Sequence, residues 1–184
     1  MNPFTDFKPD QLPESANPVL DKTRAAFGFV PNMAAQLALS PVTLNAYLDN
    51  LKAFSQTSFS PAEQQLVILA ASVETNVPYS VAVHTILGRA SALPEETIQA
   101  VRDSKPLTDN RLNALVKFTQ VAAREGGDVP AEEVAEFVAA GWTRVHMIEI
   151  LFAISVKTLV FNFQRLAHVP LDEALSSGRW ELAS

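Results

Sequence analysis

The stretch SPAEQQLVILAASVETNVPYSVAVHTILGRA, Ser60–Ala90, decides the fold. Ser60-Pro61-Ala62-Glu63 is a capping box, in which the serine oxygen and the glutamate carboxylate accept hydrogen bonds from amides at a helix start. The apolar run that follows is interrupted at Asn76-Val77-Pro78, where the asparagine is expected to cap a second helix that has proline in its first turn. The stretch therefore predicts two adjacent helices over 61–75 and 77–91.

Similar capping signals occur along the rest of the chain. Asn17-Pro18 and Ser40-Pro41 each place a capping side chain before a proline, and Gly28 and Gly141 fit helix ends. Apolar residues recur with a helical period and no segment shows strand alternation, so we predict an all-α, single-domain helical bundle. The predicted helices cover 18–27, 33–39, 41–55, 61–75, 77–91, 95–103, 109–125, 131–140 and 144–168, with a turn at 171–176.

The domain limits follow from where the helical pattern starts and stops. Residues 1–16 contain three prolines and are expected to form an extended N-terminal arm, before a helical domain over 17–177 and a tail over 178–184. Such arms either lie on a neighbouring subunit or fray in solvent. The sequence leaves both alternatives open.

Composition and charge narrow the class of protein. Hydrophobic residues make up 48% of the 184 positions and charged residues 18%, an apolar balance that indicates burial in an oligomer. The net charge of −6 and the absence of a basic cluster argue against nucleic acid as a partner. With no cysteine, the chain has no disulfide, thiolate nucleophile or cysteine-ligated zinc.

Neither membrane insertion nor export is expected. The N-terminal residues MNPFTDFKPD lack the basic and apolar regions of an export signal, so a cytoplasmic location is the expectation. Residues 148–166 are strongly apolar but include Glu149, Lys157 and Arg165. Each charge at the centre of a bilayer would cost about 2.5–3.5 kcal/mol, so this segment is expected to be a buried helix.

His84 is the first candidate for chemistry. Ser80 precedes it by four residues, so the hydroxyl and the imidazole lie on one helix face, near a helix start that favours negative charge. Imidazole transfers protons near neutral pH. The alternative is a structural histidine, buried at a helix crossing and bonded to a polar neighbour.

The segment resembles the carboxymuconolactone decarboxylase family, which includes the alkylhydroperoxidase D-like proteins. Their motif is a glutamate, eleven residues, then Cys-Gly-Tyr-Cys, three residues and a histidine. In that register His84 matches the histidine and Tyr79 the residue before the second cysteine. Ser80 and Val77 stand at the two cysteines, and Gln65 stands at the glutamate.

The resemblance extends beyond the motif and implies more than the fold. Several short segments look like the peroxidase-related subgroup: Phe29-Val30-Pro31-Asn32, Ser40-Pro41, Ala140-Gly141, Asn162-Phe163 and Pro170-Leu171-Asp172. The family resemblance also implies a homo-oligomer, as a dimer, trimer or hexamer.

The departures from the motif decide which activity is expected. In the family's peroxidases the second cysteine attacks the peroxide, the first resolves it, and the glutamate and histidine relay the proton. Val77, Ser80 and Gln65 remove both sulfurs and the carboxylate. A serine hydroxyl is neither acidic nor oxidisable in that way, so thiol-dependent peroxidase activity is predicted to be absent.

Two functions remain open. One is a cysteine-independent enzyme, in which His84 acts as acid or base on a small anionic carbonyl or lactone compound, with Ser80, Tyr79 and Gln65 in the catalytic site. The other is a redox-dead homologue that serves as an oligomeric ligand-binding or interaction module. An enzyme predicts a pocket at His84 and Ser80, whereas a dead homologue predicts Val77 packed over a filled site.

Other polar residues have simpler interpretations. His146 and Glu149 have a metal-ligating spacing but lack a second pair, so no metal site and no cofactor are expected. Lys157 is expected to pair with an acid or to reach solvent. Trp142 and Trp180 are expected to be anchors of the core or of an interface.

Overall fold

The computed structural model describes residues 2–4 and 7–181, and all the regular elements in this part of the chain are helical. The nine α-helices lie within two residues of the predicted ranges at each end. In chain order the elements are η1 (Pro9–Gln11), η2 (Glu14–Ala16), α1 (Asn17–Phe27), α2 (Asn32–Leu37), α3 (Pro41–Phe54), α4 (Pro61–Glu74), α5 (Pro78–Ala90), α6 (Glu95–Arg102), α7 (Asn110–Arg124), α8 (Ala131–Ala139), α9 (Arg144–Ala167) and η3 (Glu173–Gly178).

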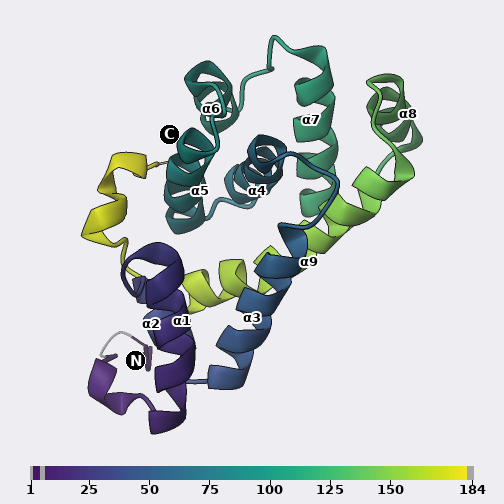
Figure 1. Cartoon of the computed structure of the whole chain (residues 1–184). Helices are drawn as coiled ribbons and strands as arrows, with labels where there is room; N and C mark the ends of the chain where they lie inside the picture. Colours follow the sequence, from purple (N-terminus) through teal and green to yellow (C-terminus); the bar gives the residue numbers. More distant parts are fainter. Residues whose placement is uncertain (1, 5–6, 182–184) are drawn as a thin grey trace.

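Helix α4 lies at the centre of the molecule, with α5, α6, α7 and α9 packed around it (Figure 1). Its residues 66–73 are all buried, which explains why its sequence is apolar on every side. The expected capping box fixes its start: Glu63 accepts from the Ser60 amide at 2.9 Å, and Ser60 accepts from the Glu63 amide at 3.3 Å.

The link between α4 and α5 differs from its prediction. Asn76 does not cap α5, because its backbone adopts the left-handed conformation with φ of 50° and Val77 occupies the capping position. The Val77 amide donates back to the carbonyl of Ser72 at 3.0 Å, so this link closes the end of α4. A short polar side chain tolerates the left-handed region, which explains asparagine here.

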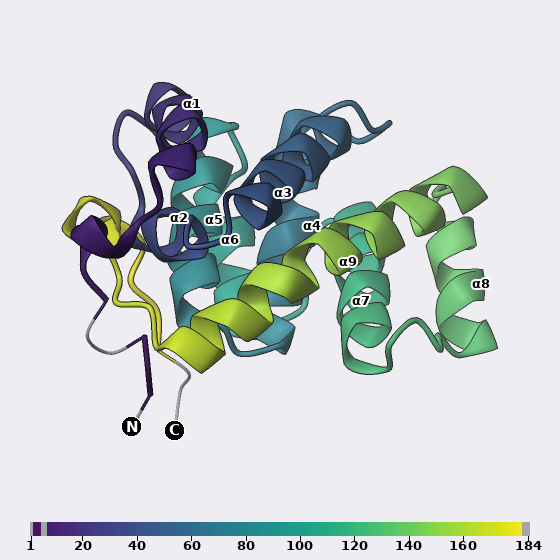
Figure 2. The same cartoon turned by 90° about the horizontal axis from the view of Figure 1, so that it is seen from below.

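Helix α9 crosses the whole molecule (Figure 2). Its length and composition alone would suit a membrane span. One face of α9 is buried in the protein, and the opposite face leaves apolar side chains in solvent. Its buried residues include Ile150, Ala153, Val160 and Phe161, and its exposed apolar residues are Val145, Ile148, Leu151, Leu159 and Leu166.

Both terminal segments contact the helical body. Residues 9–16 form two short 3-10 turns and the buried Ala16 leads directly into α1. Near the other end Trp180 is buried, and its indole N–H donates to the carbonyl of Arg102 at 3.0 Å. The proposed domain limits stay a prediction, and residues 1, 5–6 and 182–184 of the arm and tail lie outside the described residues.

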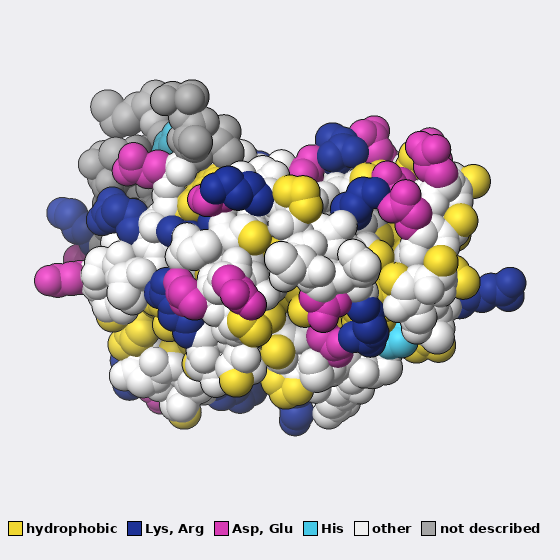
Figure 3. Space-filling view, turned by 90° about the horizontal axis from the view of Figure 1, so that it is seen from above, with side chains coloured by type: hydrophobic (Ala, Val, Ile, Leu, Met, Phe, Trp, Pro, Cys, Tyr) yellow, Lys and Arg dark blue, Asp and Glu magenta, His cyan; other side chains and the backbone are white. Residues whose placement is uncertain are grey.

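Basic and acidic side chains are mixed on one face of the surface (Figure 3), as the absence of a basic cluster in the sequence predicts. On the face that Figure 3 shows, Lys and Arg side chains lie among Asp and Glu side chains. This face therefore has no separate basic patch of the kind that binds nucleic acid.

Candidate functional site

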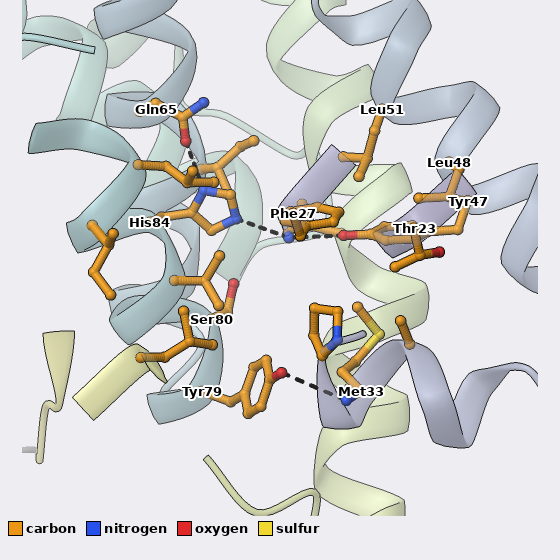
Figure 4. A pocket seen from close by; sticks show the side chains of 18 of the residues that line it. Thr23, Phe27, Met33, Tyr47, Leu48, Leu51, Gln65, Tyr79, Ser80 and His84 are labelled. Atoms are coloured by element: carbon orange, nitrogen blue, oxygen red, sulfur yellow. Dashed lines mark hydrogen bonds between the residues drawn. The ribbon is translucent and has the colours of Figure 1, made fainter. Parts of the chain in front are cut away.

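His84 and Gln65 face each other from the neighbouring helices α5 and α4 (Figure 4). Nδ1 of His84 lies 2.8 Å from Oε1 of Gln65. An amide oxygen only accepts, so the hydrogen of the neutral imidazole is on Nδ1 and Nε2 keeps a lone pair. The polar side chain at the family's glutamate position therefore sets the tautomer of His84.

Lys157 from α9 lies on the other side of the imidazole. Its Nζ is 3.0 Å from Nε2 of His84 and donates to the Tyr47 hydroxyl at 3.2 Å. The lysine is 4% exposed, and no ion pair formed within residues 2–4 and 7–181 includes it. The expectation that Lys157 pairs with an acid or reaches solvent is therefore wrong.

Burial controls the charges of this group. It lowers the pKa of Lys157 to about 7. Burial, and secondly the charge of Lys157, lower the pKa of His84 well below its usual 6.5, and burial raises the pKa of Tyr47. Near neutral pH His84 is thus an uncharged base, Tyr47 is a protonated phenol, and Lys157 is divided between amine and ammonium.

Ser80 and Tyr79 have other hydrogen-bond partners than His84. The Ser80 hydroxyl lies 2.9 Å from that of Ser72, which donates to the carbonyl of Ile68 at 2.7 Å. The Tyr79 hydroxyl donates to the Asp172 carboxylate at 2.6 Å, and burial and this carboxylate raise the pKa of Tyr79. Tyr79 thus attaches the C-terminal segment to α5.

A cavity of about 230 Å³ adjoins the group. His84, Ser80, Tyr79 and Gln65 all line it (Figure 4). Lys157 lines it as well. Most of the remaining wall is apolar and comes from α1, α2, α3, α4 and α5. The wall includes Phe27, Met33, Leu44, Leu48, Leu51 and Leu87.

The cavity is relevant to the choice between an enzyme with a pocket at His84 and a dead homologue with Val77 packed over a filled site. Val77 is buried but is not part of the cavity wall, so the space at His84 is not filled by the residue at the first cysteine position. Several wall residues are partly exposed, and they mark the side on which the cavity approaches solvent. They are Phe27, Phe29, Leu48, Leu51, Ile86 and Leu87.

One further polar group in the wall lacks a partner. Gln164 lies on α9 seven residues after Lys157, on the same helix face. Its buried Oε1 has no hydrogen-bond partner within the part of the chain that the structure describes. A buried acceptor without a partner is costly, and a donor on a bound molecule would satisfy it.

The described residues contain no group of three metal-ligating side chains from His, Asp or Glu. The candidate pair His146 and Glu149 has other roles. Nδ1 of His146 accepts from the Thr143 amide at 3.0 Å, and Glu149 accepts from the Ser58 amide at 3.0 Å. Trp142 and Trp180 are both buried, as expected of anchors.

Comparisons with known proteins identify the fold. No protein-family model matches the sequence, and no curated protein matches it. A peroxidase-related protein from Ralstonia eutropha JMP134 with an alkylhydroperoxidase AhpD core aligns over 92% of this chain and 91% of its own, at 16% identity and a TM-score of 0.78. A peroxidase-related protein from Silicibacter sp. TM1040 aligns over 95% and 91%, at 14% identity and a TM-score of 0.76.

The debrominase Bmp8 has the same fold. It aligns over 90% of both chains, at 12% identity and a TM-score of 0.73, and another structure shows a variant of it in complex with 2,3,4-tribromopyrrole. At these low sequence identities, the likeness to the solved structures establishes the fold but not the activity or the ligand. The chain therefore has the alkylhydroperoxidase D-like fold that the motif predicts, without any cysteine.

Sequence analysis missed Lys157, Tyr47 and Gln164 as members of the site. One feature of the sequence indicates that Lys157 is buried. Lys157 lies on the same helix face as Ile150, Ala153 and Val160, and that pattern indicates a buried lysine.

Proposed function

We propose that the protein is a cysteine-independent enzyme that binds a small carbonyl compound, lactones included, in the cavity and uses His84 to transfer protons. One observation carries the proposal: Nε2 of His84 holds a lone pair beside Nζ of Lys157 at the wall of a cavity of about 230 Å³. A base and a hydrogen-bond donor at one wall suit a polarised C=O group.

The remaining surroundings favour a mostly apolar ligand with few polar groups. Tyr47 keeps its proton, so its hydroxyl is a donor, and most of the wall consists of aliphatic and aromatic side chains. The debrominase of the same fold holds 2,3,4-tribromopyrrole, a small ring compound, which supports a ligand of similar size here. A carboxylate on the ligand would be stabilised by the positive charge of the ammonium form of Lys157.

The test compares His84→Ala with a matched variant, Thr119→Ala. Thr119 is buried on α7, outside the cavity wall, and its hydroxyl donates to the carbonyl of Leu115 at 2.8 Å. Both variants should lose stability, on the order of 1–3 kcal/mol. Only His84→Ala should lose binding or turnover of carbonyl compounds, and unchanged binding and turnover in it would refute the assignment.

The apolar wall favours a second function, ligand binding without turnover. The same cavity would then hold its ligand unchanged, and His84 and Lys157 would supply hydrogen bonds only. Chromatography of the ligand after prolonged incubation separates the two functions, because a binding module returns all of it chemically intact.

We also propose that copies of this chain associate through the exposed apolar face of α9. Val145, Ile148 and Leu166 are each more than half exposed on that face. Water-exposed apolar patches of this kind mark association surfaces.

A further inference from the structure

We propose that Lys157 is a covalent anchor, whose Nζ forms an imine with the carbonyl carbon of a small, mainly apolar aldehyde or ketone in the cavity. The inference rests on the proposed function, because it names the carbonyl class that this cavity takes. It adds a covalent step in which Lys157 is the nucleophile.

The position of the amine supports this step. Lys157 lines the cavity, is nearly inaccessible to water, and has two uncharged neighbours, Nε2 of His84 and the hydroxyl of Tyr47. An exposed lysine is an ammonium ion near neutral pH and has no lone pair for attack. Desolvation in an apolar pocket without a carboxylate favours the neutral, nucleophilic amine.

The neighbouring groups can manage the protons of imine formation. The Nζ lone pair forms the C–N bond while the carbonyl π pair moves to oxygen, and His84 Nε2 takes one proton from nitrogen and passes it to that oxygen. The second hydrogen on nitrogen is transferred to the same oxygen, the electron pair on nitrogen forms the C=N bond as the C–O bond breaks, and one water leaves. Both hydrogens of the amine are then in the water, so the step needs no oxidant or reductant.

The His84 tautomer suits this transfer. Its Nδ1 hydrogen is donated to Gln65, which leaves Nε2, the nitrogen that faces Nζ of Lys157, as the basic atom of the ring. An imidazole that is a weak base when buried is a strong acid once protonated, and it therefore gives the proton up to the departing oxygen. At the same wall, Oε1 of Gln164 would accept from a hydroxyl or N–H elsewhere on the compound.

The test uses benzaldehyde as the probe, with cyanoborohydride to reduce an imine to a stable secondary amine. Labelled sites are mapped by peptide mass spectrometry at pH 7 on the wild-type chain, on Lys157→Arg and on Lys52→Arg. Lys52 is an exposed lysine on α3 and serves as the matched control. Lys157→Arg keeps a positive charge and cannot form an imine.

We expect Lys157 to be labelled roughly a hundredfold faster than Lys52, because an exposed lysine is almost wholly protonated at pH 7. Labelling should persist at position 157 in Lys52→Arg, and Lys157→Arg should lose the fast phase. Binding is followed in parallel by the shift in thermal unfolding. Binding of benzaldehyde without preferential labelling of Lys157 would overturn the imine but leave the proposed function. No binding of benzaldehyde, acetophenone or a simple lactone would count against both.

Discussion

Nζ of Lys157 lies 3.0 Å from Nε2 of His84, although 73 positions separate the two residues in the chain. The contact joins α9 to α5 inside the protein, at the wall of the cavity. Burial opposes the charged form of both groups, and the charge of Lys157 additionally opposes protonation of His84.

The first prediction concerns acid stability. The folded-state pKa of His84 is lowered, so between that pKa and about 6.5 the unfolded chain binds a proton that the folded chain does not. The free energy of unfolding should fall as the pH drops below about 6.5, by up to roughly 1.4 kcal/mol per pH unit. Urea unfolding between pH 5 and 7.5 measures this slope.

A matched pair of variants isolates the contribution of His84. His84→Gln should remove this part of the slope, whereas His168→Gln, at an exposed position after α9, should keep it. Equal slopes in the wild type and His84→Gln would show that His84 is not desolvated in the folded state.

The motif register located part of the site from the sequence. Gln65 and His84, which the register places at two motif positions, contact each other from the two helices that the stretch 60–90 predicts. The partner on the other side comes from α9, and the spacing of residues along the chain does not specify such a tertiary contact. Ser80 and His84 were correctly placed on one face, but the bond of Ser80 to Ser72 depends on how α4 packs on α5.

The second prediction contrasts two buried glutamines. Oε1 of Gln164 has no partner in the described part of the chain, whereas Gln64 donates to the carbonyl of Phe59 at 3.2 Å and to Thr57 at 3.3 Å. Gln164→Leu should leave the free energy of unfolding unchanged or raise it. Gln64→Leu should lower it by about 1–3 kcal/mol, because the Phe59 carbonyl loses its donor. A large loss in Gln164→Leu would mean that the side chain is satisfied in solution.

The third prediction is self-association through α9. Light scattering at micromolar concentration should return a mass well above the 20.0 kDa of one chain. Ile148→Lys should shift the protein toward the monomer, because Ile148 is 68% exposed on the apolar face of α9. Val42→Lys is the control, since Val42 is 77% exposed but lies on another helix, α3. A monomeric wild type would refute this prediction.

The fourth prediction is that the chain does not reduce hydroperoxides with a dithiol. Val77 and Ser80 replace both sulfurs, and an alcohol does not replace a thiolate toward peroxide. Cumene hydroperoxide with dithiothreitol should disappear at the rate measured without protein. Turnover above that background after treatment with a chelator would contradict the prediction.

The most direct test of the site is an NMR titration of the lysine side chains, labelled with ¹³C at Cε. We predict that one lysine titrates with a pKa of about 7, and that its resonance is missing from the spectrum of Lys157→Arg. If the resonance of Lys157 instead titrates near the ordinary lysine value of 10.5, no neutral amine faces His84 at physiological pH, and the proposed chemistry of the cavity is wrong.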